Sequence, residues 1–437
     1  MKRINNSVIA LSLFVGIANA NAQEKKTLSL DEAVQLGIQN SKNLKIDAAK
    51  IEEATADLLE AKNRQLPELK VSGSYMYLPI KPNVDIKLPG VSGAGGPEVH
   101  QVLYGSANLS VPIYSGGRIK YGIQSAKYLV EASKLSTEND KIAIAYNVAQ
   151  AYNNLFKANQ SIKVFEENLA ASQKRDETFL KMENNGLIAR NDRLKANLQT
   201  SNIELQLLEA KNNYNIANIN MDLLLGIPET TELEVDENYI EEGSDVKPVD
   251  FYVTEARENR KDLQALAQQR KAAELGSKAA KAENLPSIAF TGGYVAADIP
   301  KFLTIYNAVN VGIGISYNLS NLWKENSSLR QSKAREKQLA ATDELLNDNI
   351  KLDVNREYQN TDYSKKRIAV FEKSAEQANE NYRITKNKYD NGLATMTELL
   401  DADAAQIAAN VGVINAKADA ALAYRKLLQT TGTLTIK

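Results

Sequence analysis

Apolar residues recur along this chain with two different periods, every three to four residues in some segments and every two residues in others. From about residue 119 to residue 184 there is no proline, and apolar residues recur every three or four positions, as in a helix with one packed face. The packed face comprises Ile144, Val148, Ala151, Leu155, Ala158, Ile162, Phe165 and Leu169. At about 1.5 Å per residue, such a helix is on the order of 100 Å long. Asn185 and Gly186 then favour a helix end, and a return helix from about residue 192 completes a hairpin over about 119–225.

The period of two marks four segments that we predict to be strands, at about 70–78, 105–114, 287–296 and 308–320. In the last segment one face is apolar, with Val309, Val311, Ile313, Ile315, Tyr317 and Leu319. A strand between lipid and water shows this alternation, and so does a half-buried sheet in a soluble domain. Four strands are too few to close a barrel, so strands in a membrane would require several chains to share one barrel.

The chain contains one unit twice. Matching residues are separated by 206 positions in one set, which includes Tyr152 and Tyr358, and by 219 positions in another, which includes Tyr75 and Tyr294. The thirteen-residue difference between these offsets lies between the two strands of the first copy. Residues 79–97 in that stretch are rich in proline and glycine and are expected to form a loop, where insertions are tolerated.

These offsets divide the chain into two repeats and a connection. The first repeat is expected over 23–227 and the second over 249–437, with a helical hairpin at about 323–430. Residues 228–248 join them and contain eight acidic residues but no basic residue before Lys247, which is typical of a solvated linker. Short secondary structure at the waist of the molecule is the alternative for this segment. The expected fold is mainly α with a small β part, built from tandem long helical hairpins and four strands.

The composition of the chain argues against several classes of function. Residues 1–22 have the basic start, short apolar core and small residues of a secretory signal peptide. The formal net charge of −1 argues against nucleic acid as a partner. The chain has no cysteine, a single histidine (His100) and no glycine-rich phosphate loop between a strand and a helix. We therefore expect no enzyme activity, no cofactor and no metal site.

Several short motifs occur in order along the two repeats. They are LSLDEA at 28–33, Leu-Pro pairs at 66–67 and 285–286, VPIYSGGR at 111–118, NGLIARNDRLKA at 185–196 and YDNGLATMTELLDA at 389–402. With these motifs the chain resembles the TolC-like outer-membrane efflux proteins (outer membrane factors) over essentially its full mature length. The resemblance implies a homotrimer in which four strands per chain form a twelve-stranded transmembrane β-barrel, embedded in outer-membrane lipid. The helical hairpins would continue this barrel as a periplasmic α-barrel.

The resemblance also implies a place and a function. The protein would lie in the outer membrane of a Gram-negative bacterium, with a large periplasmic portion. It would be the passive exit duct of a tripartite efflux system, joined by a periplasmic adaptor (membrane fusion protein) to an inner-membrane pump, either of the RND type or an ABC exporter. The outer-membrane component of type I protein secretion uses the same scaffold and is not separated by the sequence. A periplasmic coiled-coil structural or adaptor protein is a more distant alternative, which the strand pairs disfavour.

Acidic residues after the second hairpin turn are the candidate aperture residues. Glu398 and Asp401 are spaced i, i+3 and share one helix face. The resemblance implies that they line the periplasmic aperture, where rings of carboxylates favour cations. Asp192 matches Glu398 at the 206 offset and is the weaker candidate, while Asp403 is expected to lie only on the surface. A solvated helix face would show the same spacing.

The two hairpin turns are the candidate adaptor contacts. They carry Gly186 with Leu187 and, at the 206 offset, Gly392 with Leu393. The resemblance implies that these exposed turns meet the tip of the adaptor. A helix cap closed by glycine and a leucine contact would need no partner, so the sequence leaves both interpretations open.

Overall fold

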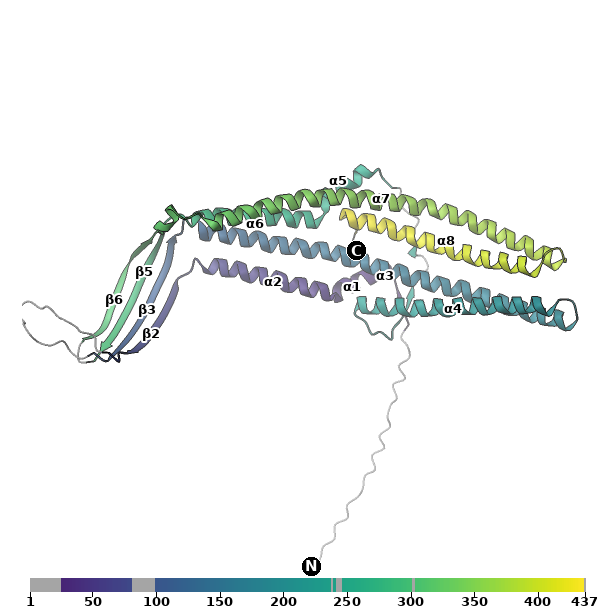
Figure 1. Cartoon of the computed structure of the whole chain (residues 1–437), viewed down its shortest axis with the longest axis horizontal. Coiled ribbons are helices and arrows are strands. Elements are labelled where there is room, and N and C mark those ends of the chain that lie inside the picture. The colour runs from purple at the N-terminus through teal and green to yellow at the C-terminus, as the bar shows by residue number, and fades with distance from the viewer. Residues whose placement is uncertain (1–24, 81–98, 237–238, 241–245, 301–302, 436–437) are drawn as a thin grey trace, which may run out of the picture.

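A computed structural model of the chain describes residues 25–80, 99–236, 239–240, 246–300 and 303–435. The molecule is one elongated slab, with a β-sheet at one end and the turns of two helical hairpins at the other (Figure 1). The expected signal peptide (1–22) and most of the 79–97 loop lie outside the described residues. No helix in the described part of the chain is both long and apolar enough to cross a membrane.

The two repeats fold alike. The first contains α1 (Leu30–Asn40), α2 (Lys42–Asn63), β2 (Glu68–Tyr77), β3 (Gln101–Tyr114), α3 (Arg118–Asn184) and α4 (Arg190–Leu225). The second contains α5 (Val249–Asn259), α6 (Lys261–Ala282), β5 (Ser287–Ile299), β6 (Leu303–Ser316), η2 (Leu319–Leu322), α7 (Ser327–Asp390) and α8 (Met396–Thr431). A shift of 219 superposes the bounds of α1 and α2 on those of α5 and α6, and a shift of 206 does the same for α4 and α8. The predicted mainly α fold with tandem hairpins and a small sheet is confirmed.

The four long strands form one antiparallel sheet in the order β2-β3-β5-β6. Its two hairpins have the same register: Ser72 pairs with Ser106, and their repeat equivalents Thr291 and Gly312 pair with each other. β2 and β6 are the edges of this sheet and have no second strand partner among the described residues. Exposed apolar side chains follow the edge strands, at Leu69, Val71, Tyr75, Tyr77, Val309, Val311, Ile313 and Ile315.

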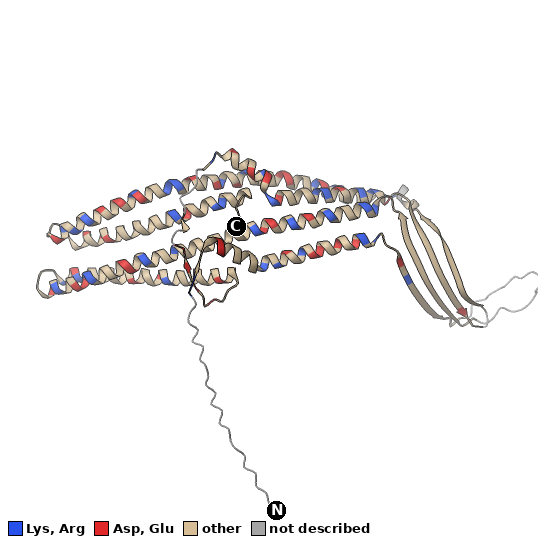
Figure 2. Cartoon of the chain, turned by 180° about the vertical axis from the view of Figure 1, so that it is seen from behind, with Lys and Arg blue, Asp and Glu red and all other residues tan. Residues whose placement is uncertain are grey.

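Charged residues are spread over the helices and nearly absent from the sheet (Figure 2). The four strands contain only Glu68, Lys70 and Asp298, and each lies near a strand end. The last strand is shorter than predicted, since β6 ends at Ser316 rather than at residue 320. The Asn318 side chain accepts a hydrogen bond from the Ser320 backbone N–H (3.1 Å) and begins the 3₁₀ helix η2 instead.

The long helices lie side by side in a layer four elements wide (Figure 1). Next to the sheet the order is α2, α3, α6, α7, and towards the hairpin turns it is α4, α3, α8, α7. One long edge of the slab is therefore formed by β2, α2 and α4, and the other by β6 and α7. Each edge presents elements that are packed on one side only.

A small second sheet lies at the waist, where β1 (Lys25–Leu28) pairs in parallel with β4 (Glu232–Val235). Tyr152 of α3 holds both strands, because its hydroxyl donates to the Leu28 carbonyl and accepts from the Asp236 backbone N–H, both at 2.8 Å. The 228–248 segment was expected to be a solvated linker, and for β4 this is wrong, since Leu233 is fully buried in the main core. Apolar residues that alternate with acidic ones allow β4 to pack on the hairpin, while the carboxylates of Glu232 and Glu234 stay partly or fully exposed.

An amide on α4 fixes β4 to the hairpin. The Asn218 side chain donates to Asp222 Oδ2 (2.9 Å) and to the Thr231 carbonyl (2.7 Å), and it accepts from the Leu233 backbone N–H (2.9 Å). Asp222 is fully buried, and its Oδ1 has no hydrogen-bond partner in the described part of the chain. Burial, together with the nearby Glu229, raises the pKa of Asp222 to about 6.

Candidate functional site at the hairpin tips

Both hairpin turns are closed by the same cap. Gly186 and Gly392 have φ angles of 73° and 72°, in the left-handed region that favours glycine. In each turn the following leucine N–H donates to the carbonyl five residues earlier, at 2.8 Å, which is the long hydrogen bond of a Schellman cap. The turns are therefore rigid, with one geometry at two places.

The leucines of these caps point into solvent. Leu187 is 69% exposed and Leu393 is 77% exposed, and a Cβ added at either glycine would meet no atom within 4 Å. The caps thus do not bury their leucines, although Schellman caps often do. Two large apolar side chains stand at the outermost point of the slab and contribute nothing to closing the turns.

Glu398, a predicted aperture residue, caps the helix on which it lies. Its Oε2 accepts from the Thr395 backbone N–H (2.6 Å) and from Thr395 Oγ1 (2.8 Å), while Thr395 Oγ1 accepts from the Glu398 N–H (3.3 Å). This is a complete capping box at the start of α8. The hydrogen bonds from Thr395 lower the pKa of Glu398. The Thr-x-x-Glu spacing in the sequence carries this signal.

Asp401 and Asp192 differ in how free their carboxylates are. Asp401 lies one turn after Glu398, is exposed, and has no hydrogen bond or ion pair among the described residues. Asp192 is half-buried at the start of α4 and lies 3.4 Å from Lys195 Nζ. Of the three predicted aperture carboxylates, only that of Asp401 has neither a hydrogen bond nor an ion pair among the described residues.

The tips of the two hairpins touch each other. Lys195 Nζ of α4 donates to Thr397 Oγ1 of α8 at 3.3 Å, which brings the Asp192 turn of helix next to that of Glu398. Beneath this contact, an apolar cluster from both hairpins is buried and comprises Phe179, Ala196, Met396 and Leu399. The Phe179 ring also meets Tyr389 edge-on, with centroids 5.9 Å apart. The two tips therefore form a single packed unit.

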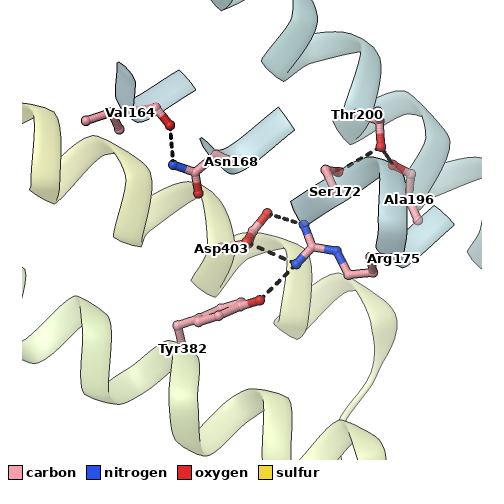
Figure 3. A network of polar contacts seen from close by, with 8 residues as sticks. All are labelled: Val164, Asn168, Ser172, Arg175, Ala196, Thr200, Tyr382 and Asp403. Carbon is pink, nitrogen blue, oxygen red and sulfur yellow. Dashed lines mark hydrogen bonds and ion pairs between the residues drawn. The ribbon is translucent and has the colours of Figure 1, made fainter. Parts of the chain in front are cut away.

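Two helical turns behind the tips, a buried ion pair joins the hairpins (Figure 3). Arg175 of α3 donates through both terminal nitrogens to the two carboxylate oxygens of Asp403 on α8, at 3.1 and 2.7 Å. Arg175 also donates to the hydroxyl of Tyr382 on α7, at 2.9 Å. We call these three residues the tip latch. The prediction that Asp403 lies only on the surface is wrong, since it is 4% exposed.

Burial and pairing act in opposite directions on the tip latch. Burial opposes the charge of Arg175, but the hydrogen bonds and charge of Asp403 outweigh it and raise the arginine pKa. The sequence contained a signal for this contact. Asp403 lies between Leu399 and Ile407 at intervals of four, on the packed face of α8. A carboxylate on a packed face requires a partner, but its identity depends on the approach of α3.

The described residues contain no group of three or more His, Cys, Asp or Glu side chains that could hold a metal ion. The polar groups at the tips form caps, ion pairs and one free carboxylate. This arrangement can hold helices together and attract or repel charged solutes.

Comparison with known proteins agrees with this architecture. A family model described as outer membrane efflux protein matches residues 33–227 and 252–433. No curated protein matches the chain by sequence.

Solved structures of outer-membrane channels are similar to the chain over nearly its whole length. The Vibrio cholerae outer membrane protein VceC has a TM-score of 0.74 at 17% identity, covering 92% of this chain and 96% of that one. The Campylobacter jejuni CmeC outer membrane channel has a TM-score of 0.75 at 18% identity, with 93% and 86% covered. The Neisseria gonorrhoeae MtrE outer membrane channel, in its open state, has a TM-score of 0.73 at 17% identity, with 93% and 89% covered. The matched family model spans both repeats, and the chain belongs to the outer membrane efflux protein family.

Proposed function

We propose that three copies of this chain form a channel-tunnel, which is the passive exit duct of a tripartite efflux system in the outer membrane of a Gram-negative bacterium. A periplasmic adaptor would join the duct to an inner-membrane pump, of the RND type or an ABC exporter. The observation that carries the proposal is the open four-stranded sheet at the end of a helical slab. It supports a shared barrel because both sheet edges are unpaired in the described part of a single chain.

The unpaired edges support assembly. β2 and β6 expose their outer backbone N–H and C=O groups, which lipid does not tolerate and which in water favour pairing with another strand. Strand directions alternate across the sheet, so β6 of one chain would meet β2 of the next in antiparallel orientation. Three sheets joined in this way make a closed barrel of twelve strands, within the size range of outer-membrane barrels.

The sheet surface supports a lipid environment. Val309, Val311, Ile313 and Ile315 on one face of β6 are each about 70% exposed in the single chain. The only charges lie near strand ends, at Glu68, Lys70 and Asp298 (Figure 2). A band of apolar side chains bordered by charge matches the hydrocarbon layer of a membrane and its two interfaces. In a soluble protein such a band would need a covering domain.

The helices support a long conduit. α3 has 67 residues and is on the order of 100 Å long at about 1.5 Å per residue. The hairpin tips would therefore lie far from the membrane, where a periplasmic adaptor can reach them. Leu187 and Leu393, with the rigid caps of Gly186 and Gly392, are proposed as the adaptor contact, because they are exposed apolar side chains on preorganised turns.

At the tips, Asp401 is the proposed selectivity residue of the aperture. Its carboxylate is exposed and unpaired, so three copies around an opening would attract cations. Glu398 lies beside it and adds negative charge, while its hydrogen bonds with Thr395 hold the helix start. Asp192, close to Lys195, contributes least to the ring.

The proposal is tested by mass and by conductance. Native protein extracted in mild detergent would be measured by light scattering corrected for bound detergent, and the same sample would be inserted into planar bilayers. A trimer that conducts ions supports the duct. A monomer that stays in solution without detergent contradicts it, because the sheet would then be an ordinary soluble one.

A further inference from the structure

The four-stranded sheet has one polar face, and its register shows which residues lie there. Asn310 stands between two exposed valines of β6, so its side chain is on the face opposite to the apolar one. Register pairs link Asn310 to Gly293 and Gly293 to Asn108. Asn108 in turn pairs with Lys70, and paired residues on neighbouring strands share a face. Lys70, Asn108 and Asn310 therefore form one row across the polar face, which we call the lysine row.

The amides of the lysine row approach each other above a glycine. A Cβ added at Gly293 would lie 3.0 Å from Asn310 Oδ1 and 3.3 Å from Asn108 Oδ1, so both side chains lean over β5. Asn108 Nδ2 also donates to Ser106 Oγ at 3.2 Å, and Ser106 Oγ lies 2.9 Å from Ser72 Oγ. Hydrogen-bonding side chains thus run across the polar face from β2 to β6.

Lys70 is the only cation of the four-stranded sheet among the described residues. It is exposed, and its side chain has no hydrogen bond or ion pair in that part of the chain. Glu68 lies on the same face two residues earlier, opposite Ser110 in the next row, and no ion pair joins it to Lys70. The ammonium group is therefore available to a solute.

The internal repeat indicates that strand pairing does not need this lysine. Shifts of 219 and 206 carry Lys70 to Ala289 and Asn108 to Gly314. Ala289 and Gly314 are register partners in β5 and β6, as Lys70 and Asn108 are in β2 and β3. The same pairing thus forms with alanine and glycine, so this position requires neither a charge nor an amide to build the hairpin.

In the trimer proposed above, on which this inference rests, the polar face lines the lumen and the three lysine rows form a ring. Twelve strands about 4.8 Å apart and tilted by about 40° enclose a backbone cylinder about 24 Å across. Its axis lies about 12 Å from the backbone, and the lysine side chains extend inward from the wall. The Debye length is about 10 Å at 0.1 M salt, so the field of the three ammonium groups reaches the axis.

We propose that the lysine row is a lumenal binding site for the carboxylate or phosphate groups of anionic solutes. Lys70 supplies the charge, and rings of lysine favour anions in pores. Asn108 lies on the adjacent strand, about 4.8 Å away, so one oxyanion can accept hydrogen bonds from both side chains. Asn310, two strands farther, offers a donor to a second anionic group of a larger solute.

The position of this ring gives the duct two regions of opposite charge preference. Lys70 is the third residue of β2, which follows α2, so the ring lies where the helical conduit enters the barrel. Asp401 at the hairpin tips, by contrast, favours cations. A solute that has passed the tips thus meets a site for its anionic groups as it enters the barrel.

Block of ionic current measures binding at this ring. Native protein extracted in mild detergent would be inserted into planar bilayers in potassium chloride, with citrate or tripolyphosphate added in separate arms. The stronger blocker of the two identifies whether carboxylate or phosphate is preferred. Lys70→Gln removes the charge, Lys70→Arg keeps it, and Glu68→Gln removes the carboxylate in the next row. Light scattering would establish that each variant keeps the mass of the wild-type protein.

Lys70→Gln should weaken the affinity of the blocking anion about tenfold or more, since a charged hydrogen-bond donor is lost from each chain. Lys70→Arg should retain the block, and Glu68→Gln should strengthen it, because a repelling carboxylate is lost. Equal block in the wild type and in Lys70→Gln, or equal weakening by Lys70→Arg, overturns the site while leaving the duct intact. A weaker block in Glu68→Gln overturns it as well. A preparation that is monomeric or does not conduct overturns the duct, and with it this inference.

Discussion

Removing only one charge of the Arg175–Asp403 pair in the tip latch should destabilise the packing of the tips far more than removing both charges. In Arg175→Met the Asp403 carboxylate stays buried without its cation, and Tyr382 loses its hydrogen-bond donor. The two charged side chains are only 14% and 6% exposed, so solvent screens the pair little. Breaking a buried pair in this way costs about 3–5 kcal/mol. The double variant Arg175→Met/Asp403→Leu leaves no buried charge and should recover most of this free energy.

Hydrogen exchange measures the effect where it occurs. The free energy of local opening of the tip is read from amide protection in peptides covering residues 172–190 and 396–410, in the native protein extracted in mild detergent. A cost of about 3–5 kcal/mol corresponds to a loss of protection of about two to four orders of magnitude. The exposed pair Arg383–Glu380 is a matched control, since Arg383→Met breaks a bridge with 65% and 52% exposed side chains and should change protection little.

Two results would refute this reasoning. Wild-type protection in Arg175→Met would mean that the pair does not hold the hairpins together. Equal loss of protection in the single and double variants would mean that packing volume matters at this site, and not the unpaired charge.

Further predictions concern charge and the exposed tips. Asp222→Asn should stabilise the protein above pH 6 and change its stability little near pH 4. The raised pKa of Asp222 makes the wild-type protein lose stability as the pH rises through about 6, and the asparagine does not titrate. Thermal unfolding measured against pH checks this, and a difference in melting temperature that does not change with pH would contradict it. Asp401→Lys should weaken or reverse cation preference, and an unchanged reversal potential in planar bilayers would exclude it from the aperture. Glu398→Gln should mainly increase hydrogen exchange at the start of α8, since it removes a charged acceptor from the capping box; a larger effect on selectivity than that of Asp401→Lys would reverse their assigned roles. Leu187→Asp with Leu393→Asp should leave trimer mass and melting temperature unchanged, since both side chains are exposed, but should abolish export in cells; wild-type export would exclude the tips as the adaptor contact.

Periodicity and the repeat were enough to predict the architecture. The steps of three and four that predicted the long helices correspond to α3 and α4, and the offsets carried the same elements into the second half of the chain. The ends of the elements, which depend on local side-chain hydrogen bonds, were predicted less completely. At Asn318 a side-chain cap ended β6 earlier than the alternation of apolar residues indicated.

The main features that the sequence did not predict are contacts between segments far apart in the chain. Asp403 was visible as an acidic residue, but its burial depends on Arg175, which lies 228 positions away on another helix. The role of β4 was missed for the same reason, because the acidic residues of its segment dominate the composition while Leu233 is what packs. No pattern within one segment contains information about how two helices approach each other.

The pairing of β1 with β4 sets an order of folding. Lys25 and Glu232 are register partners, so β1 cannot pair with β4 until the chain has been synthesised beyond the end of α4. The hydroxyl of Tyr152, which receives both strands, is in position only when α3 has folded. The loop entropy of such a distant contact must be overcome before the contact stabilises the fold, which favours its formation after the local contacts of the hairpins. The segment at the start of the described chain, synthesised before either hairpin, is thus among the last to reach its native position.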